Sequence, residues 1–263
     1  MHSEAILVIV AALIGLPFGS FLNVCIVRLP AGESIISPRS HCLNCHHPVA
    51  AFDNIPILSW IWLRGKCRYC DAKISVQYPL IEAATGILFA ACVLHSGISW
   101  QTLLDAAAVF LLLGLAMVDA ASFLLPDAFT LGGLILAIVL KGLQPHLADR
   151  AHVVVETIVA SAAATIPLLI IRWLYFAVRK REGLGMGDIK LLAMMAAFFG
   201  LPLAFLACFL AILAAAIFSL VQLFRAKLQT TEKIPFGSFL AASGIVVLFT
   251  GKQILHWYFG FFR

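Results

Sequence analysis

The sequence predicts an all-α polytopic membrane protein of about eight transmembrane helices with a small cytoplasmic four-cysteine zinc domain between the first two. Of its 263 residues, 62% are hydrophobic and only 12% are charged, whereas a soluble domain carries about 25% charged residues. The mean hydropathy is +1.02. A soluble fold of this length has too much surface to bury that many apolar side chains. Long apolar runs recur along the chain, as expected for helices that cross a bilayer.

Eight apolar segments are candidates for these helices. The expected spans cover residues 5–27, 80–97, 101–118, 128–145, 152–178, 188–200, 203–224 and 235–258. The first run has no charged residue and no basic segment before it, so we expect a retained helix over residues 1–27 rather than a cleaved signal peptide. Because the segment 188–200 is short, seven spans are an alternative to eight.

Residues 28–78 differ from the rest of the chain because they are polar and rich in cysteine and proline. A domain of about fifty residues usually needs a staple such as a metal ion. Two CxxC pairs, separated by 21 residues, supply four thiolates: Cys42, Cys45, Cys67 and Cys70. Two such pairs complete a closed tetrahedral zinc site that folds the domain and leaves no position for catalysis.

Other readings of the cysteines and their neighbours stay open. Two disulfides are the alternative to zinc, but the domain is expected in the reducing cytoplasm, where disulfides are rare. Nearby histidines could replace a thiolate ligand: these are His41, His46 and His47. The remaining cysteines lie singly in apolar runs and are expected to act as small apolar residues: these are Cys25, Cys92 and Cys208.

The basic residues predict the orientation. Lys and Arg gather in residues 28–78, 179–181 and 225–233. With eight spans these three regions lie on one side of the membrane, which the positive-inside rule assigns to the cytoplasm. The opposite side has fewer basic residues: Lys141, Arg150, Lys252 and Arg263.

Two aspartates are the candidate catalytic residues. Asp119 lies where the third span reaches the cytoplasmic side, and Asp188 begins the sixth span after Gly185-Met-Gly187. Ionisable residues at membrane depth are costly and mark functional sites. Two adjacent carboxyl groups share one proton, which lets the pair activate water and protonate a leaving group. Each aspartate alone could instead be an ordinary residue at a helix end.

The other carboxylates are weaker candidates. Asp127 follows a proline and precedes a span, which suits a helix N-cap. Glu82 opens the second span, whereas Asp105 and Glu156 are expected near the non-cytoplasmic ends of their spans, at the membrane interface. Glu4 and Asp149 are expected to be ordinary charged residues outside the spans.

Motifs along nearly the whole chain resemble those of the bacterial type IV prepilin peptidases, the GxGD-type membrane aspartic proteases also called prepilin leader peptidase/N-methyltransferases. The matching segments are Gly19-Ser-Phe-Leu-Asn-Val24, Arg28-Leu-Pro30, the two cysteine pairs, Asn54-Ile-Pro56, Tyr78-Pro79 with Glu82, Asp119 with Leu125-Pro-Asp127, Glu182-Gly-Leu-Gly-Met-Gly-Asp188 with Lys190, and Ile234-Pro-Phe-Gly237. One departure is Leu43, where the family usually has proline. Both cysteines of that pair remain.

This resemblance implies a function. Such enzymes sit in the bacterial inner membrane, cut the short basic leader from prepilins and pseudopilins of type IV pilus and type II secretion systems, and methylate the new N-terminus with S-adenosylmethionine. Residues 79–263 would form the peptidase domain, with Asp119 and Asp188 as its dyad. Residues 28–78 contain no Gly-rich nucleotide loop, so methylation rests on the resemblance alone and its cofactor-binding residues are unknown.

Two other functions fit part of the sequence. A proton-coupled transporter could use the same aspartates as a relay, but it would place them near the midplane of a repeated structure. A zinc module that binds nucleic acid would leave the aspartates unexplained. We therefore expect the lipid bilayer and prepilin substrates as partners, and no nucleic acid.

Overall fold

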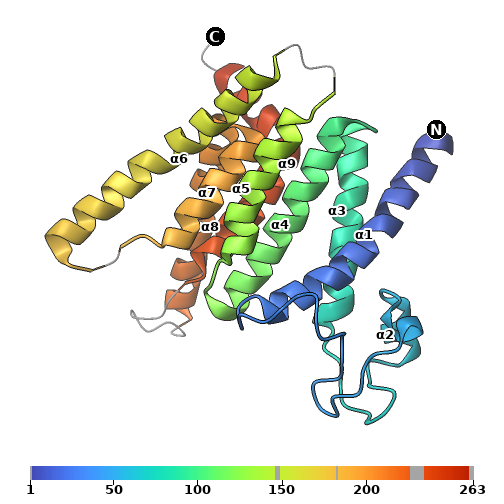
Figure 1. Ribbon diagram of the computed structural model, residues 1–263. Coiled ribbons are helices and arrows are strands. Elements are labelled where there is room, and N and C mark those ends of the chain that lie inside the picture. Colours follow the sequence, from blue (N-terminus) through green and yellow to red (C-terminus); the bar gives the residue numbers. More distant parts are fainter. Residues whose placement is uncertain (1, 146–148, 182, 226–233, 261–263) are drawn as a thin grey trace. The chain divides into compact units, whose positions relative to one another are not determined.

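The computed structural model describes residues 2–145, 149–181, 183–225 and 234–260, and these are mostly helical outside residues 29–76 (Figure 1). The elements are α1 (His2–Arg28), η1 (Ala51–Asn54), α2 (Leu58–Trp62), α3 (Gln77–Ser96), α4 (Trp100–Ser122), α5 (Asp127–Gly142), α6 (Arg150–Arg179), α7 (Met186–Phe199), α8 (Leu201–Phe224) and α9 (Phe236–Gly260). Within the described residues no strand forms, only two isolated bridges. The predicted all-α fold is therefore confirmed.

The expected number of spans needs a correction. Six described helices are long and apolar enough to cross a membrane: α1, α3, α4, α6, α8 and α9. The other two expected spans, α5 and α7, have only 16 and 14 residues, which at 1.5 Å per residue is about 24 and 21 Å. The α7 helix packs against α5, α6, α8 and α9. Because protein covers it, its length does not have to match the hydrocarbon core.

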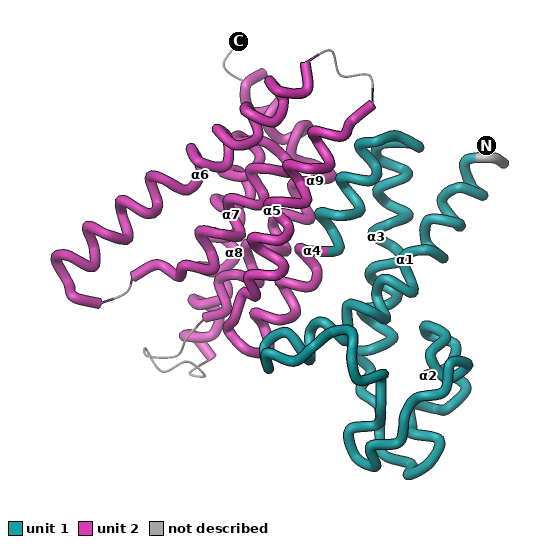
Figure 2. The backbone as a smooth tube through the Cα atoms, viewed as in Figure 1, with its two compact units in different colours: residues 1–110 teal, residues 111–263 magenta. Residues whose placement is uncertain are grey.

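The chain divides into two compact units, Met1–Phe110 and Leu111–Arg263 (Figure 2). In the first unit, α1 and α3 pack with their backbones almost in contact. A Cβ atom on Gly19 would lie 2.6 Å from Cα of Glu82, and one on Gly15 would lie 2.8 Å from Cα of Gly86. Small residues permit this approach, which is common between transmembrane helices. Asn23 adds a hydrogen bond from Nδ2 to the Tyr78 carbonyl, 3.1 Å long.

The second unit gathers four helix ends at one place. Ser238, in the first turn of α9, hydrogen-bonds Asp119 in the last turn of α4. Lys190 of α7 contacts Asp127, the first residue of α5. The C-terminal end of α4 and the N-terminal ends of α5, α7 and α9 therefore meet, and we call this place the aspartate end of the unit. The unit's core holds fully buried apolar side chains, among them Leu112, Leu115, Met194, Met195, Leu240 and Val247.

Candidate functional site

Asp119 is buried, and Ser238 supplies its hydrogen bonds. The Ser238 backbone N–H donates to Oδ2 of Asp119 over 2.6 Å, and the Ser238 hydroxyl lies 3.0 Å from the same oxygen. That hydroxyl also lies 2.9 Å from the Ala116 carbonyl. A hydroxyl has one proton to donate and can also accept. Ser238 can therefore donate to an ionised Asp119, or accept from a protonated Asp119 while donating to Ala116.

Glycine at position 237 makes this approach possible. A Cβ atom there would lie 3.0 Å from Cγ of Asp119 and 2.9 Å from Cδ1 of Leu125. Leu125 also lies against Gly187, because a Cβ atom built on Gly187 would be 2.9 Å from the Cβ of Leu125. Leu125 thus fills the space between the glycine beside Ser238 and the glycine beside Asp188.

Asp188 lies in the first turn of α7, half-buried. Its carboxylate folds back over Gly185, as shown by the short distance of 2.6 Å between Oδ2 of Asp188 and a Cβ atom built on Gly185. Asp188 is within electrostatic reach of Asp119. The structure therefore brings the two predicted residues, which come from different helices, to the same end of the unit.

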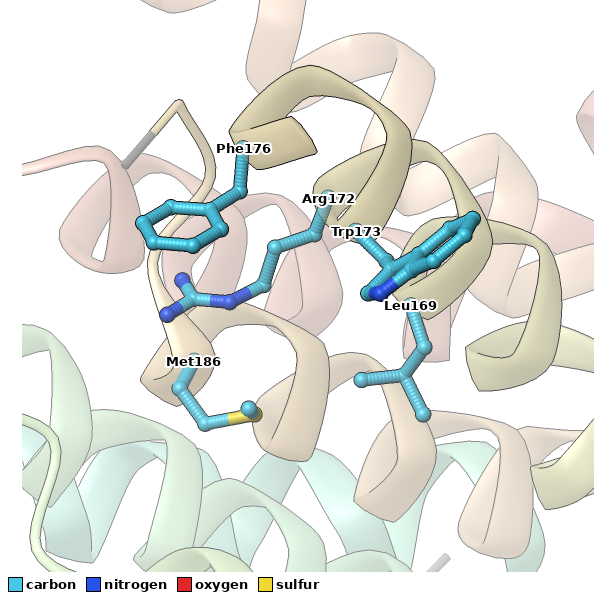
Figure 3. Close-up of a pocket in the computed structure, with 5 residues that line it drawn as sticks. All are labelled: Leu169, Arg172, Trp173, Phe176 and Met186. Atoms are coloured by element: carbon cyan, nitrogen blue, oxygen red, sulfur yellow. The ribbon is translucent and has the colours of Figure 1, made fainter. Parts of the chain in front are cut away.

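The C-terminal half of α6 positions the loop before Asp188. Arg172 donates a hydrogen bond to the carbonyl of Leu184, and Gly183 packs under the ring of Tyr175. Glu182 of the predicted motif lies outside the described residues. Beside this loop is a cavity of about 320 Å³ (Figure 3). Its lining residues are Leu169, Arg172, Trp173 and Phe176 of α6 and Met186 of α7.

Asp127 has a different role from the one its sequence context indicates. The N-cap of α5 is Pro126, and no side chain caps this helix end. Asp127 is instead the first helical residue, where a carboxylate is favoured by the helix dipole. Its Oδ1 lies 2.6 Å from Nζ of Lys190. This ion pair joins the first turns of α5 and α7 at the aspartate end.

Two other carboxylates are buried with partners inside the first unit. Glu82 accepts a 2.7 Å hydrogen bond from the backbone N–H of Ile57. Asp105 accepts from Ser96 Oγ at 2.6 Å and from Gln101 Nε2 at 2.7 Å. Asp105 lies five residues after the start of α4, and these two polar neighbours make its burial possible.

The four paired cysteines form one compact cluster. Their Sγ atoms all lie within 4.8 Å of one another, with 3.7 Å between Cys42 and Cys70 and 4.0 Å between Cys45 and Cys67. A disulfide requires about 2.05 Å, whereas zinc with Zn–S bonds near 2.3 Å separates its sulfurs by about 3.8 Å. The cluster therefore has the spacing of a tetrahedral metal site.

Backbone groups favour the thiolate form that a metal requires. N–H groups of Cys45 and Asn44 lower the pKa of Cys42 to about 6. The N–H of Ala72 lowers the pKa of Cys70 in the second pair. Among the described residues, no histidine belongs to the cluster, and the ring of His47 packs instead on Tyr69. The three single cysteines are free thiols: Cys25, Cys92 and Cys208.

Ser238 is the site residue that sequence reasoning missed. A lone serine at the start of an apolar helix carries no distinctive pattern. The available signal was its position directly after Pro235-Phe-Gly237, a helix start that brings a backbone N–H toward another element. Only the fold shows that this element is the end of α4.

The sequence matches known protein families and individual proteins along nearly the whole chain. Residues 13–96 match the bacterial peptidase A24 N-terminal domain, and residues 106–220 match the type IV leader peptidase family. A prepilin leader peptidase/N-methyltransferase from Stutzerimonas stutzeri is 35% identical over 97% of this chain and 95% of its own length. A protein of the same name from Aeromonas hydrophila is 32% identical, over 94% of this chain and 91% of its own length. Another from Pseudomonas aeruginosa is 33% identical, over 97% of this chain and 94% of its own length.

No solved structure matches the chain. The two matched family ranges include the cysteine pairs and the two aspartates, respectively. The chain belongs to the prepilin leader peptidase/N-methyltransferase family, and six of its described helices are long and apolar enough to cross a membrane.

Proposed function

We propose that this enzyme cleaves the leader peptides of type IV prepilins and pseudopilins with Asp119 and Asp188 as its catalytic dyad. One observation carries the proposal: two half-buried or buried carboxylates from separate helices reach the same end of the second unit, and Leu125 packs against the glycines beside both. Family membership gives the reaction class, and the aspartate end provides acidic groups suited to it.

The hydrogen bonds suggest a separate role for each aspartate. Donors directed at a carboxylate stabilise its charged form, and Ser238 supplies two such groups to Asp119. Asp119 would then be the base that takes a proton from water as the water attacks the scissile carbonyl. Asp188 would hold the shared proton and deliver it to the leaving amine, so that the peptide bond breaks and both carboxyl groups can exchange protons with solvent.

The surrounding glycines would serve the substrate. An extended segment at the aspartate end would approach the backbone of residues 183–187, where Gly185 and Gly187 flank Met186 and carry no side chains of their own. The cavity beside Met186 is mostly apolar, which suits the apolar residues that follow a prepilin leader.

A transporter is less well supported. Asp119 lies three residues before the end of α4, and Asp188 is the third residue of α7. Both are at helix ends, whereas a proton relay is expected near the middle of the membrane. None of the relatives described above is named as a transporter.

The decisive experiment is leader cleavage by purified full-length enzyme with a model prepilin. Asp119→Asn and Asp188→Asn should each lower the rate by about 10²- to 10⁴-fold, because an amide cannot transfer the proton. Glu33→Gln is the matched control, since it removes an exposed carboxylate in the first unit that belongs to no contact of the aspartate end. Near-normal processing by either dyad variant would overturn the assignment.

We further propose that the enzyme N-methylates the cleaved product with S-adenosylmethionine at a site separate from the dyad. The names of the relatives support the methyl transfer, and an aspartate pair has no means of alkylating an amine. Asp188→Asn enzyme, given an already cleaved pilin with a free terminus, should still methylate it by mass spectrometry. If methylation disappears while the variant keeps its fold, the aspartates serve both steps.

We propose a domain division and an orientation as well. Residues 28–78 would be a zinc-binding domain, with Cys42, Cys45, Cys67 and Cys70 as ligands, and residues 79–263 the peptidase domain. Both the zinc domain and the aspartate end would face the cytoplasm from the bacterial inner membrane. The basic residues of the connecting segments support this orientation.

A further inference from the structure

The short helix α2 has two faces of opposite character. On the inner face, Ser59 Oγ donates to the Phe52 carbonyl, and Trp60 Nε1 donates to the Ile74 carbonyl. The Trp60 ring also covers Gly65, where a Cβ atom would lie 2.9 Å from the indole. These contacts fix which side of α2 faces the cysteine domain.

The outer face of α2 is apolar and uncovered. Leu58, Ile61 and Trp62 are 62%, 60% and 84% exposed. At 100° per residue these three positions fall within about one third of the helix circumference, so they form one continuous surface. Three large apolar side chains on one face of a five-residue helix are more than scattered surface residues. We call these three residues the α2 patch.

A hydrogen bond fixes the height of the α2 patch relative to α3. The N–H of Ile57, the residue before α2, donates to the buried Glu82 carboxylate over 2.7 Å. Ile57 has φ +63°, a conformation that is costly for a β-branched residue and persists only where the surroundings fix it. Glu82 is five residues from the start of α3, a candidate membrane span, or about 7.5 Å along its axis.

The α2 patch is therefore held near one end of a helix that is long and apolar enough to cross a membrane. The polar layer on each side of a bilayer, about 5–7 Å thick, begins where such a helix leaves the hydrocarbon core. On α3 itself, Leu80 is exposed near the same end of the helix. We propose that the α2 patch inserts into the interfacial layer of the bilayer beside α3 and anchors the cysteine domain to the membrane surface.

The side chains of the patch suit lipid better than another protein. Tryptophan is enriched at membrane interfaces because its ring is apolar and its N–H is polar. Arg64 and Lys66 follow the patch directly and are exposed, as in interfacial helices that bind anionic lipid. This anchor depends on the first unit alone and is independent of the catalytic proposal.

The first test uses photo-crosslinking in the full-length protein. Benzoylphenylalanine replaces Trp62 in one sample and Leu43 in the other, and both are reconstituted in vesicles of phosphatidylethanolamine and phosphatidylglycerol. Leu43 is the matched control because it is also a strongly exposed apolar residue, at 71% against 84% for Trp62, and lies between the first two cysteines. After irradiation, lipid adducts measured by mass spectrometry should be many-fold more abundant at position 62. Equal lipid labelling at the two positions, or mainly protein adducts at 62, would overturn the anchor.

A second measurement avoids the unnatural residue. Tryptophan fluorescence is recorded in vesicles whose lipids carry bromine near the glycerol end of the acyl chains. The Trp62→Phe variant should lose part of the quenched signal, while lipids brominated at the chain centre should produce a smaller difference between the two proteins. If Trp62→Phe leaves the quenched fraction unchanged, Trp62 does not touch lipid and the proposal fails.

Discussion

The backbone N–H of Ser238 donates to the carboxylate of Asp119 across 119 residues of sequence. This bond places the start of α9 against the end of α4 and gives the buried carboxylate a donor that no side-chain substitution removes. The Ser238 hydroxyl adds a second contact. A substitution of Ser238 can remove the hydroxyl contact and keep the N–H contact, so the effect of each on Asp119 can be measured separately.

Ser238→Ala should reduce cleavage only moderately. The variant removes the hydroxyl and keeps the N–H, so the loss is one hydrogen bond of about 1 kcal/mol, which corresponds to about a fivefold lower rate. Steady-state cleavage of a model prepilin measures it, with thermal unfolding as a check on the fold. A loss as complete as that of Asp119→Asn would mean that the hydroxyl itself takes part in the reaction.

Gly237→Ala should reduce cleavage far more strongly than Ser238→Ala. The new methyl group would lie 3.0 Å from Cγ of Asp119 and 2.9 Å from Leu125, so the carboxylate or α9 must move. Gly132→Ala is the matched control, because a Cβ atom there meets nothing within 4 Å, and alanine is the better helix former. Cleavage assays on both variants should separate them clearly. Full activity in Gly237→Ala would contradict the close packing at the aspartate end.

The purified protein should contain about one zinc ion per chain, held by the four-cysteine cluster. Cys67→Ser should lose the metal by elemental analysis, because three thiolates and a hydroxyl make a much poorer site. Cys208→Ser is the control, since that thiol lies apart from the cluster in α8. Retention of full metal content in Cys67→Ser, or its loss in Cys208→Ser, would show that the ligand assignment is wrong.

Reporter fusions should place residues 28–78 and the segment near Lys180 in the cytoplasm. A fusion after Gly97, between α3 and α4, should report the opposite side. The segment 226–233, which carries part of the predicted basic charge, lies outside the described residues, but a fusion there tests the same expectation. If the fusion near Lys180 reports the outside, Asp119 and Asp188 could not both face the cytoplasm with residues 28–78, and the proposed topology fails.

The sequence predicted the helices well because transmembrane segments are recognised by composition. Eight apolar runs correspond to α1 and α3 to α9. Their lengths were less predictable, because α7 is covered by neighbouring helices and the bilayer does not set its extent. Composition also cannot show that α2 exists, since its five residues have no period long enough to detect.

Individual polar contacts were the least predictable part. The role of Asp127 depends on Lys190, 63 residues later, and the burial of Asp105 depends on Ser96 and Gln101. No local pattern encodes such pairings. By contrast, the CxxC spacing brings the two thiols of each pair together within one turn. The cysteine cluster therefore required only that these two turns come together.

The close contact of α1 and α3 has a consequence for how this architecture can change. The chain leaves α1 and returns to α3 at nearly the same place, because Gly19 lies against Glu82 and Asn23 reaches Tyr78. Everything between is therefore an insertion with adjacent ends, and the closure entropy of such a loop varies only slowly with its length. The inserted module can therefore be exchanged or enlarged while the helix pair keeps its register, provided that a donor replaces the N–H that Ile57 gives to the buried Glu82.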